Sequence, residues 1–203
     1  NIGEKSLEKY GQWPWPRQYY AQMISDLRSA NAGVIGITVM YPEADRFGGD
    51  EVFTSWVKDN GVVLSQVPSS KGRSNIAPYI GTAVLGEGDP YNFVYRYNAL
   101  VPNIPLLEDA ADGVGMVNAA IEVDNLVRRM PLITQVNDQL YPSFPMELIR
   151  VLQKKPSYSM HVEETGIIDL MIPPYEPIKT DYTGSIWINF SNQFQQMEYS
   201  DPL

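Results

Sequence analysis

The sequence predicts an α/β fold: a single domain with a central mixed, partly parallel sheet flanked by helices. Two short apolar runs, residues 34–40 and 62–67, are rich in β-branched residues, as strands buried on both faces are. Each run follows a segment with amphipathic helical spacing, and this alternation is typical of a partly parallel sheet. No domain boundary interrupts the chain, so residues 1–203 are expected to form one domain.

Local signals place the other elements. Apolar residues at helical spacing predict helices, apolar β-branched runs predict strands, and Gly, Asn and Pro mark their ends. In chain order the predicted elements are a helix over 17–30, a strand over 34–40, a helix over 50–59, a strand over 62–67, short strands over 80–85 and 93–100, a helix over 105–111, strands over 114–121 and 127–136, a helix from 145, and strands over 158–162, 167–172 and 185–190. Residues 122–125 predict a tight hairpin connection, because Asp and Asn tolerate left-handed backbone conformations.

Composition excludes several classes of function. The net charge of -9 argues against nucleic acid and anionic membrane surfaces as partners, because both would repel the chain. Cysteine is absent and His161 is the single histidine, so disulfides, thiolate catalysis and cysteine or histidine-rich metal sites are excluded. The chain carries no phosphate-binding glycine pattern and no apolar run long enough for a membrane span. We therefore expect no cofactor and no metal.

Residues 13–17, Trp-Pro-Trp-Pro-Arg, form the most distinctive segment, which we call the Trp–Pro segment. Proline fixes φ and keeps the preceding residue extended, so Trp13 and Trp15 are held in fixed directions at little entropic cost. One interpretation is a structural clamp that packs both rings on the core and leads into a helix at Pro16. The other is an aromatic platform, with Arg17 beside it, for a ligand or partner.

Four residues are candidates for lining a ligand cleft: Arg17, Tyr41, Asn118 and Arg128. Tyr41 follows a predicted central strand, at the edge where α/β sheets place their clefts. Asn118 interrupts an apolar strand, and a buried amide needs hydrogen-bond partners. Arg128 could reach a carboxylate or phosphate of a ligand, or it could form a turn-stabilising pair with Asp124. Loop carboxylates also leave open a pair for glycoside hydrolysis, from Glu43, Asp45, Asp50, Glu122 and Asp124.

The order of these pieces resembles the second-type CHASE domain family, the extracytoplasmic sensory domains of bacterial receptors. The residues that carry the resemblance are Ser6-Leu7, the Trp–Pro segment at the head of a helix, the strand at 34–40, Asp50, the strand at 61–64, residues 115–118, residues 124–131 with their arginines, Tyr141-Pro142-Ser143, Thr180-Asp181 before Gly184, and the strand at 188–190. The match spans nearly the whole chain. The chain departs from the family in lacking an acidic residue near Thr38 and at Gly3.

The resemblance implies a sensory domain on the outer side of the cytoplasmic membrane, without catalytic residues of its own. The parent receptor is expected to span the membrane, to work as a homodimer, and to control a cytoplasmic output such as a nucleotide cyclase or a kinase. The family's opening and closing strands are not evident here, so the domain is expected to be truncated at both ends.

Three functions remain open from the sequence. The first is a non-enzymatic input domain that binds a small-molecule or envelope signal, which an enclosed, polar-lined cavity near Thr38, Asn118 and Arg128 would favour. The second is a module that recognises an envelope protein or glycan without a small-molecule pocket, which an exposed Trp13 or Trp15 would favour. The third is an extracytoplasmic hydrolase, which needs two carboxylates that converge in one cleft.

Overall fold

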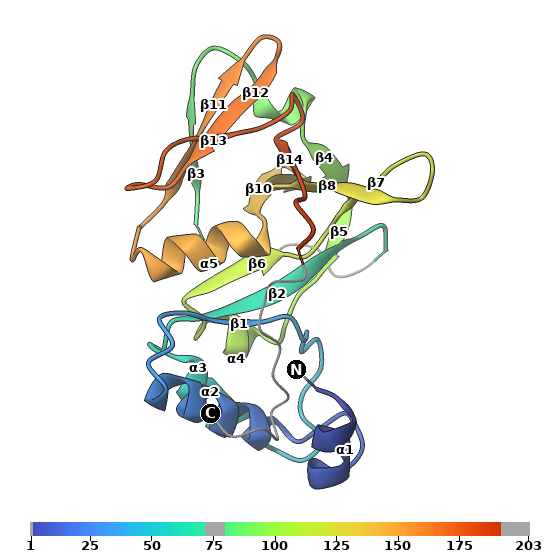
Figure 1. The fold of residues 1–203 in the computed structure, drawn as a ribbon, viewed down its shortest axis with the longest axis vertical. Helices are drawn as coiled ribbons and strands as arrows, with labels where there is room; N and C mark the ends of the chain where they lie inside the picture. Colours follow the sequence, from blue (N-terminus) through green and yellow to red (C-terminus); the bar gives the residue numbers. More distant parts are fainter. Residues whose placement is uncertain (1, 72–79, 192–203) are drawn as a thin grey trace.

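The computed structural model describes residues 2–71 and 80–191, a mixed α/β chain with five α-helices and four small sheets (Figure 1). The helices are α1 (Glu4–Tyr10), α2 (Arg17–Ser29), α3 (Asp50–Val57), α4 (Pro105–Glu108) and α5 (Phe144–Leu152), and η1 (Pro90–Asn92) is a 3-10 turn. Four of these helices match predicted ones, and α1 was not predicted. Residues 72–79, between the predicted strands over 62–67 and 80–85, lie outside the described residues.

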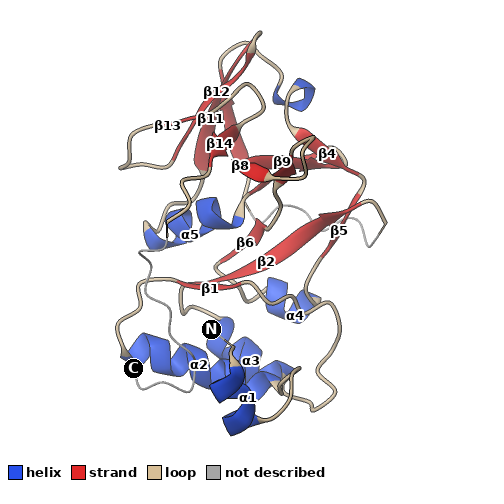
Figure 2. Cartoon of the chain, turned by 45° about the vertical axis from the view of Figure 1, so that its right-hand side comes forward, coloured by secondary structure: helices blue, strands red, loops and turns tan. Residues whose placement is uncertain are grey.

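The sheet that matches the predicted one has two parallel strand pairs, and we call it the partly parallel sheet. It contains β1 (Ile35–Ile37), β2 (Val62–Ser69), β5 (Ala99–Val101) and β6 (Gly113–Met116). β2 lies between β1 and β6 and is parallel to both, while β5 pairs antiparallel with the far end of β2. Helices α2, α3 and α4 lie on one side of this sheet and α5 lies on the other (Figures 1 and 2).

The prediction of a single central sheet is wrong, because the remaining strands form three further sheets. These sheets, in strand order, are β10 (Gln139–Pro142), β9 (Ile133–Val136) and β4 (Tyr95–Tyr97); β13 (Ile178–Lys179), β12 (Gly166–Met171), β11 (Tyr158–Glu163) and β3 (Thr82–Leu85); and β14 (Ser185–Trp187), β8 (Val127–Pro131) and β7 (Ala120–Ile121).

Two predicted strands break where the chain changes sheets. Residues 127–136 divide at Pro131, which has no N–H to donate to a ladder, and Leu132 donates instead to the carbonyl of Gly184. Residues 114–121 divide likewise, because β6 joins β2 while β7 joins β8. The predicted hairpin is confirmed only between β7 and β8, where Asn125 takes the left-handed conformation with φ of 61°.

The sheets enclose two main apolar cores. The first core packs α2, α3 and α4 beneath the partly parallel sheet, and includes Ile24, Phe53 and Leu64, each with at most 1% of its surface exposed. The second core lies between α5 and the sheets that contain β9 and β11, around Ile133 and Met160. The end of the first core nearest the Trp–Pro segment contains the candidate site.

Candidate functional site

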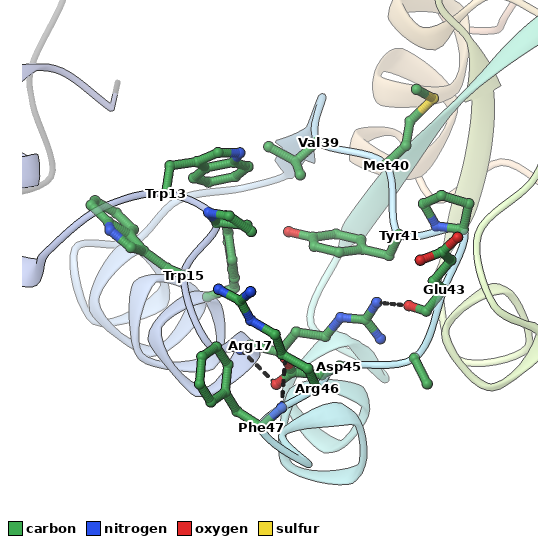
Figure 3. A pocket seen from close by; sticks show the side chains of 14 residues that line it. Trp13, Trp15, Arg17, Val39, Met40, Tyr41, Glu43, Asp45, Arg46 and Phe47 are labelled. Carbon is green, nitrogen blue, oxygen red and sulfur yellow. Dashed lines mark hydrogen bonds between the residues drawn. The ribbon is translucent and has the colours of Figure 1, made fainter.

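A pocket lies where the loop after β1 meets the start of α2. Its volume is about 400 Å³, within the range of roughly 300–1,000 Å³ that is usual for small-molecule sites. Two stretches of chain make its walls, residues 13–20 and residues 39–47 (Figure 3). The lining residues are Trp13, Pro14, Trp15, Arg17, Tyr20, Val39, Met40, Tyr41, Pro42, Glu43, Ala44, Asp45, Arg46 and Phe47. We call this hollow the Trp13–Tyr41 pocket.

The two tryptophans of the Trp–Pro segment have different surroundings. Trp15 is 4% exposed, and its indole Nε1 donates a 2.7 Å hydrogen bond to the carbonyl of Gly11. Trp13 is 43% exposed, with one side of its ring against Trp15 and Tyr20 at centroid distances of 6.2 and 6.0 Å. Trp15 therefore acts as the structural clamp, while Trp13 leaves part of its indole open to the pocket and solvent.

Arg17 is buried at the first position of α2 and ties the two walls together. Its guanidinium donates to the backbone carbonyl of Glu43 and forms an ion pair with Asp50 at the start of α3. The same guanidinium lies over the ring of Tyr41, 4.9 Å from the ring centroid. Burial lowers the pKa of Arg17 from its ordinary value, and the nearby Asp45 carboxylate partly offsets that effect.

Asp45 closes the N-terminal end of α2. Its carboxylate accepts hydrogen bonds from the backbone amides of Arg17 (3.1 Å), Gly49 (3.0 Å) and Phe47 (3.2 Å). Burial alone raises the pKa of this carboxyl, but the three amide donors outweigh burial and hold the pKa below its usual value. The ionised Asp45 thus satisfies one amide that α2 leaves without a partner, that of Arg17, and two amides of the loop before α3.

This hydrogen bonding predicts acid sensitivity at the pocket. A carboxyl whose pKa is lower in the folded than in the unfolded state stabilises the fold above the unfolded pKa, about 3.9 for Asp, and that contribution is lost as the pH falls through the folded pKa. We expect the stability difference between wild type and Asp45→Asn to shrink as the pH falls from about 7 to about 3. Urea unfolding across this range measures it, with Asp138→Asn at an exposed turn as the control. A difference that does not change with pH would contradict the role of Asp45.

Tyr41 is held in place by the loop that follows β5. Its backbone N–H donates to the Asn103 side chain at 2.9 Å, and its carbonyl accepts from the N–H of Ile104 at 2.7 Å. Asn103 is itself buried and donates to the carbonyl of Ser65 in β2 at 3.0 Å. The Tyr41 ring therefore has a fixed position, reaching into the pocket toward Trp13 (Figure 3).

Two buried phenol groups face this pocket. Tyr20 and Tyr41 are 4% and 6% exposed, and their rings meet edge to face at 5.4 Å. Neither hydroxyl has a hydrogen-bond partner of standard geometry among the described residues. Burial raises the pKa of both groups well above its ordinary value, so both hydroxyls stay protonated.

Comparison with known proteins identifies the family. The CHASE2 domain family matches residues 1–203, the whole chain. This chain belongs to the CHASE2 domain family. CHASE2 domains are extracellular sensory domains and not catalytic ones. The resemblance inferred from the sequence is therefore confirmed. No curated protein and no solved structure matches the chain.

The CHASE2 domain brings only two of the four predicted cleft residues together. Arg17 and Tyr41 both line the Trp13–Tyr41 pocket. Asn118 lies near the β7–β8 hairpin, where its amide donates a 2.9 Å hydrogen bond to Thr134. Arg128 lies on that hairpin and does not line the pocket.

The arginines of the hairpin are engaged with its own carboxylates. Arg128 pairs with Asp124 at 2.8 Å and with Glu122 at 2.9 Å, and Arg129 pairs with Asp181 at 3.0 Å. This geometry is the turn-stabilising Asp124–Arg128 pair that the sequence left open as one interpretation. A hollow of about 580 Å³ beside the hairpin is shallow and lined by five residues, Ile121, Glu122, Val123, Asp124 and Arg129. Its charged groups are already paired, so the Trp13–Tyr41 pocket is the better candidate site.

Four of the five carboxylates considered for hydrolysis are engaged by other groups in this CHASE2 domain. Asp45 accepts from backbone amides, Asp50 pairs with Arg17, and the two hairpin acids pair with Arg128. Across residues 2–71 and 80–191, no group of three or more acidic or histidine side chains is placed to hold a metal ion. None of the helices in these ranges has the length and apolarity needed to cross a bilayer.

Sequence reasoning missed Tyr20, Arg46 and Phe47 as pocket residues. Tyr20 has the spacing of a core residue on α2, and nothing in the sequence separates a buried ring from one that also lines a cavity. Arg46 and Phe47 lie in a polar loop, where the guanidinium stacks 4.7 Å from the Phe47 ring centroid. An arginine next to an aromatic residue was a usable signal, but a weak one.

Proposed function

We propose that this CHASE2 domain is the input domain of a bacterial transmembrane receptor, and that it detects a small ligand bound in the Trp13–Tyr41 pocket. Family membership supports the sensory role. The observation that carries the ligand-binding role is the pair of buried tyrosine hydroxyls at the pocket wall, which have no hydrogen-bond partner of standard geometry other than each other. A buried hydroxyl without a partner costs about 1–3 kcal/mol, which a bound polar ligand recovers.

The arrangement of the walls suggests how binding is transmitted. A ligand shifts a receptor only if it binds two conformations unequally. The pocket has one wall on the start of α2 and the other on the loop after β1, so a ligand that contacts both favours one spacing between them. Arg17 links these walls and also contacts the start of α3. We infer that α2 and α3 carry the change toward the rest of a homodimeric receptor, whose cytoplasmic output is a nucleotide cyclase or a kinase.

A pocket-blocking substitution tests this function. Ala44 is an exposed pocket residue, so Ala44→Phe fills the space at little cost in stability. Thermal shift and calorimetry with a broad panel of small periplasmic solutes should find at least one ligand of the wild type that Ala44→Phe no longer binds. Ala30→Phe, at an exposed position beyond the far end of α2, is the matched control and should bind as wild type does. A panel that yields no ligand, or a ligand indifferent to Ala44→Phe, would overturn the proposal.

The alternative is a module that recognises an envelope protein or glycan at its surface. The 43% exposure of Trp13 favours it, as does the tip of the β7–β8 hairpin, which carries the exposed apolar side chains of Ile121, Val123 and Leu126. This function predicts that Ala44→Phe leaves partner binding intact, while substitutions at Val123 and Leu126 abolish it. The two functions thus give opposite results for the same set of variants.

A further inference from the structure

The pocket contains the elements of an anion site, but the chain already uses them. A helix N-terminus and a buried arginine both attract anions in proteins. Here Asp45 accepts from the first backbone amide of α2, that of Arg17, and the Arg17 guanidinium is engaged by Asp50 and by the Glu43 carbonyl. Arg46 remains as an exposed cation at the rim, and a single solvated guanidinium contributes little net attraction. The net charge of -9 adds a repulsive background for an anion.

The aromatic lining equally resembles a cation site, and its ring faces are also taken. Organic cations bind over the faces of aromatic rings. In this pocket the guanidinium of Arg17 covers Tyr41 at 4.9 Å, and that of Arg46 covers Phe47 at 4.7 Å. A ligand cation would displace these arginines or lie beside them against like charge. Because the groups that would bind an anion or a cation are already engaged, the pocket favours an uncharged ligand.

The free groups of the pocket are hydroxyls and one aromatic surface. A tyrosine hydroxyl has one donor and two acceptor positions, so even a mutual bond between Tyr20 and Tyr41 leaves one donor and several acceptors unused. Because both groups stay protonated, they can donate to and accept from neutral partners. Trp13, which is 43% exposed, lies across the pocket from Tyr41 (Figure 3). It offers an apolar surface on which a flat C–H face can pack.

We propose that the ligand is an uncharged saccharide, with one C–H face on Trp13 and its hydroxyls on Tyr41, Tyr20 and the rim. This inference rests on the proposed small-molecule function of the pocket. A sugar ring matches the free groups, because it carries an apolar face and a rim of groups that both donate and accept hydrogen bonds. The charged rim also suits it, since the guanidinium of Arg46 and the carboxylate of Glu43 are exposed there to bond neutral hydroxyls.

Tryptophan fluorescence provides the test. The probes are glucose, galactose, mannose and N-acetylglucosamine, with choline, arginine, glutamate and inorganic phosphate as charged comparators. We expect at least one sugar to change the emission saturably at millimolar concentration or below, and the charged compounds to have no saturable effect. Trp13→Ala and Tyr41→Phe should each weaken sugar binding about tenfold or more, the equivalent of about 1.4 kcal/mol. Trp187→Phe, on β14 and outside the pocket, should not change it.

Tyr41→Phe separates a binding defect from a folding defect. It removes a buried hydroxyl that has no partner of standard geometry other than Tyr20, so the variant should unfold at a urea concentration close to that of wild type. Oligosaccharides of the sugar that binds distinguish a free monosaccharide from the end of a glycan polymer. Tighter binding with chain length indicates the polymer, and unchanged or lost binding indicates the free sugar.

The outcomes also separate this inference from the function on which it rests. Saturable binding of a charged compound with no response to sugars would overturn the saccharide and leave a ligand-binding pocket in place. Sugar binding that survives both pocket substitutions would place the sugar elsewhere and overturn the inference as well. If none of these probes binds, the saccharide inference is overturned. The broader screen with Ala44→Phe then decides whether the pocket binds any small ligand.

Discussion

Replacing Trp15 with alanine should lower the free energy of unfolding by about 3–5 kcal/mol, as for other large aromatic truncations in a core. The indole is 4% exposed and packs edge-on against Tyr10 and Tyr19, with ring centroids 5.4 and 6.2 Å away. The substitution also leaves the Gly11 carbonyl without its indole donor. The Trp–Pro segment would then lose its anchor to α1 and to the first core. Urea unfolding followed by circular dichroism measures the effect.

Trp13→Ala is the matched control, because it removes an equal volume from the same segment. Because Trp13 is 43% exposed, its truncation should lower the free energy of unfolding by only about 1–2 kcal/mol. This loss comes from the part of the ring that packs on Trp15 and Tyr20. A cost of about 3–5 kcal/mol would apply to Trp13 only if it were packed in the core. Equal losses for the two variants would show that the segment acts as one unit, and would contradict separate roles for the two rings.

The helices and the parallel strands could be predicted because their signals are local. Proline before Arg17, apolar residues at helical spacing and a following glycine specify α2 and α3 without reference to distant residues. β1 and β2 are recognisable because strands buried on both faces are continuously apolar. α1 was missed because its seven residues include only one apolar aliphatic residue, Leu7, which is 37% exposed.

The division into four sheets could not be predicted, because strand pairing depends on residues far apart in the chain. β3 pairs with β11, and β4 pairs with β9, across long stretches of intervening sequence. Pro131 was visible as a residue unable to donate to a ladder. The sequence does not reveal, however, that the chain after it turns to a different sheet.

The candidate site was predictable only where it depends on local signals. Arg17 and Tyr41 stand at a helix start and a strand end, two positions that α/β folds bring to one edge. Asn118 and Arg128 were chosen for their chemistry, and the hairpin geometry directs them to Thr134 and Asp124 instead. The chemistry of a polar side chain marks it as a candidate, but its position depends on strand pairings that the sequence does not show.

Replacing Arg17 with methionine should destabilise the domain by about 3 kcal/mol, near the lower end of the range for breaking a buried ion pair. Arg17 is 6% exposed, and methionine keeps most of its length while it removes the charge. The loss removes the guanidinium that pairs with the Asp50 carboxylate and donates to the Glu43 carbonyl. Asp50 retains 18% exposure, which lets water offset part of the cost. Arg46→Met, at an exposed position of the same pocket, should change stability by no more than about 0.5 kcal/mol.

A second substitution identifies the source of the cost. If the uncompensated carboxylate dominates, adding Asp50→Asn to Arg17→Met should recover part of the lost stability, because the burial penalty of the charge disappears. The amide oxygen introduced by Asp50→Asn could still accept the 2.9 Å hydrogen bond that Asp45 donates through its backbone N–H. If Asp50→Asn instead adds a further loss to that of Arg17→Met, the two residues act independently. In that case Arg17 stabilises the pocket mainly through the Glu43 carbonyl and the face of Tyr41, and its link to α3 would not carry a signal.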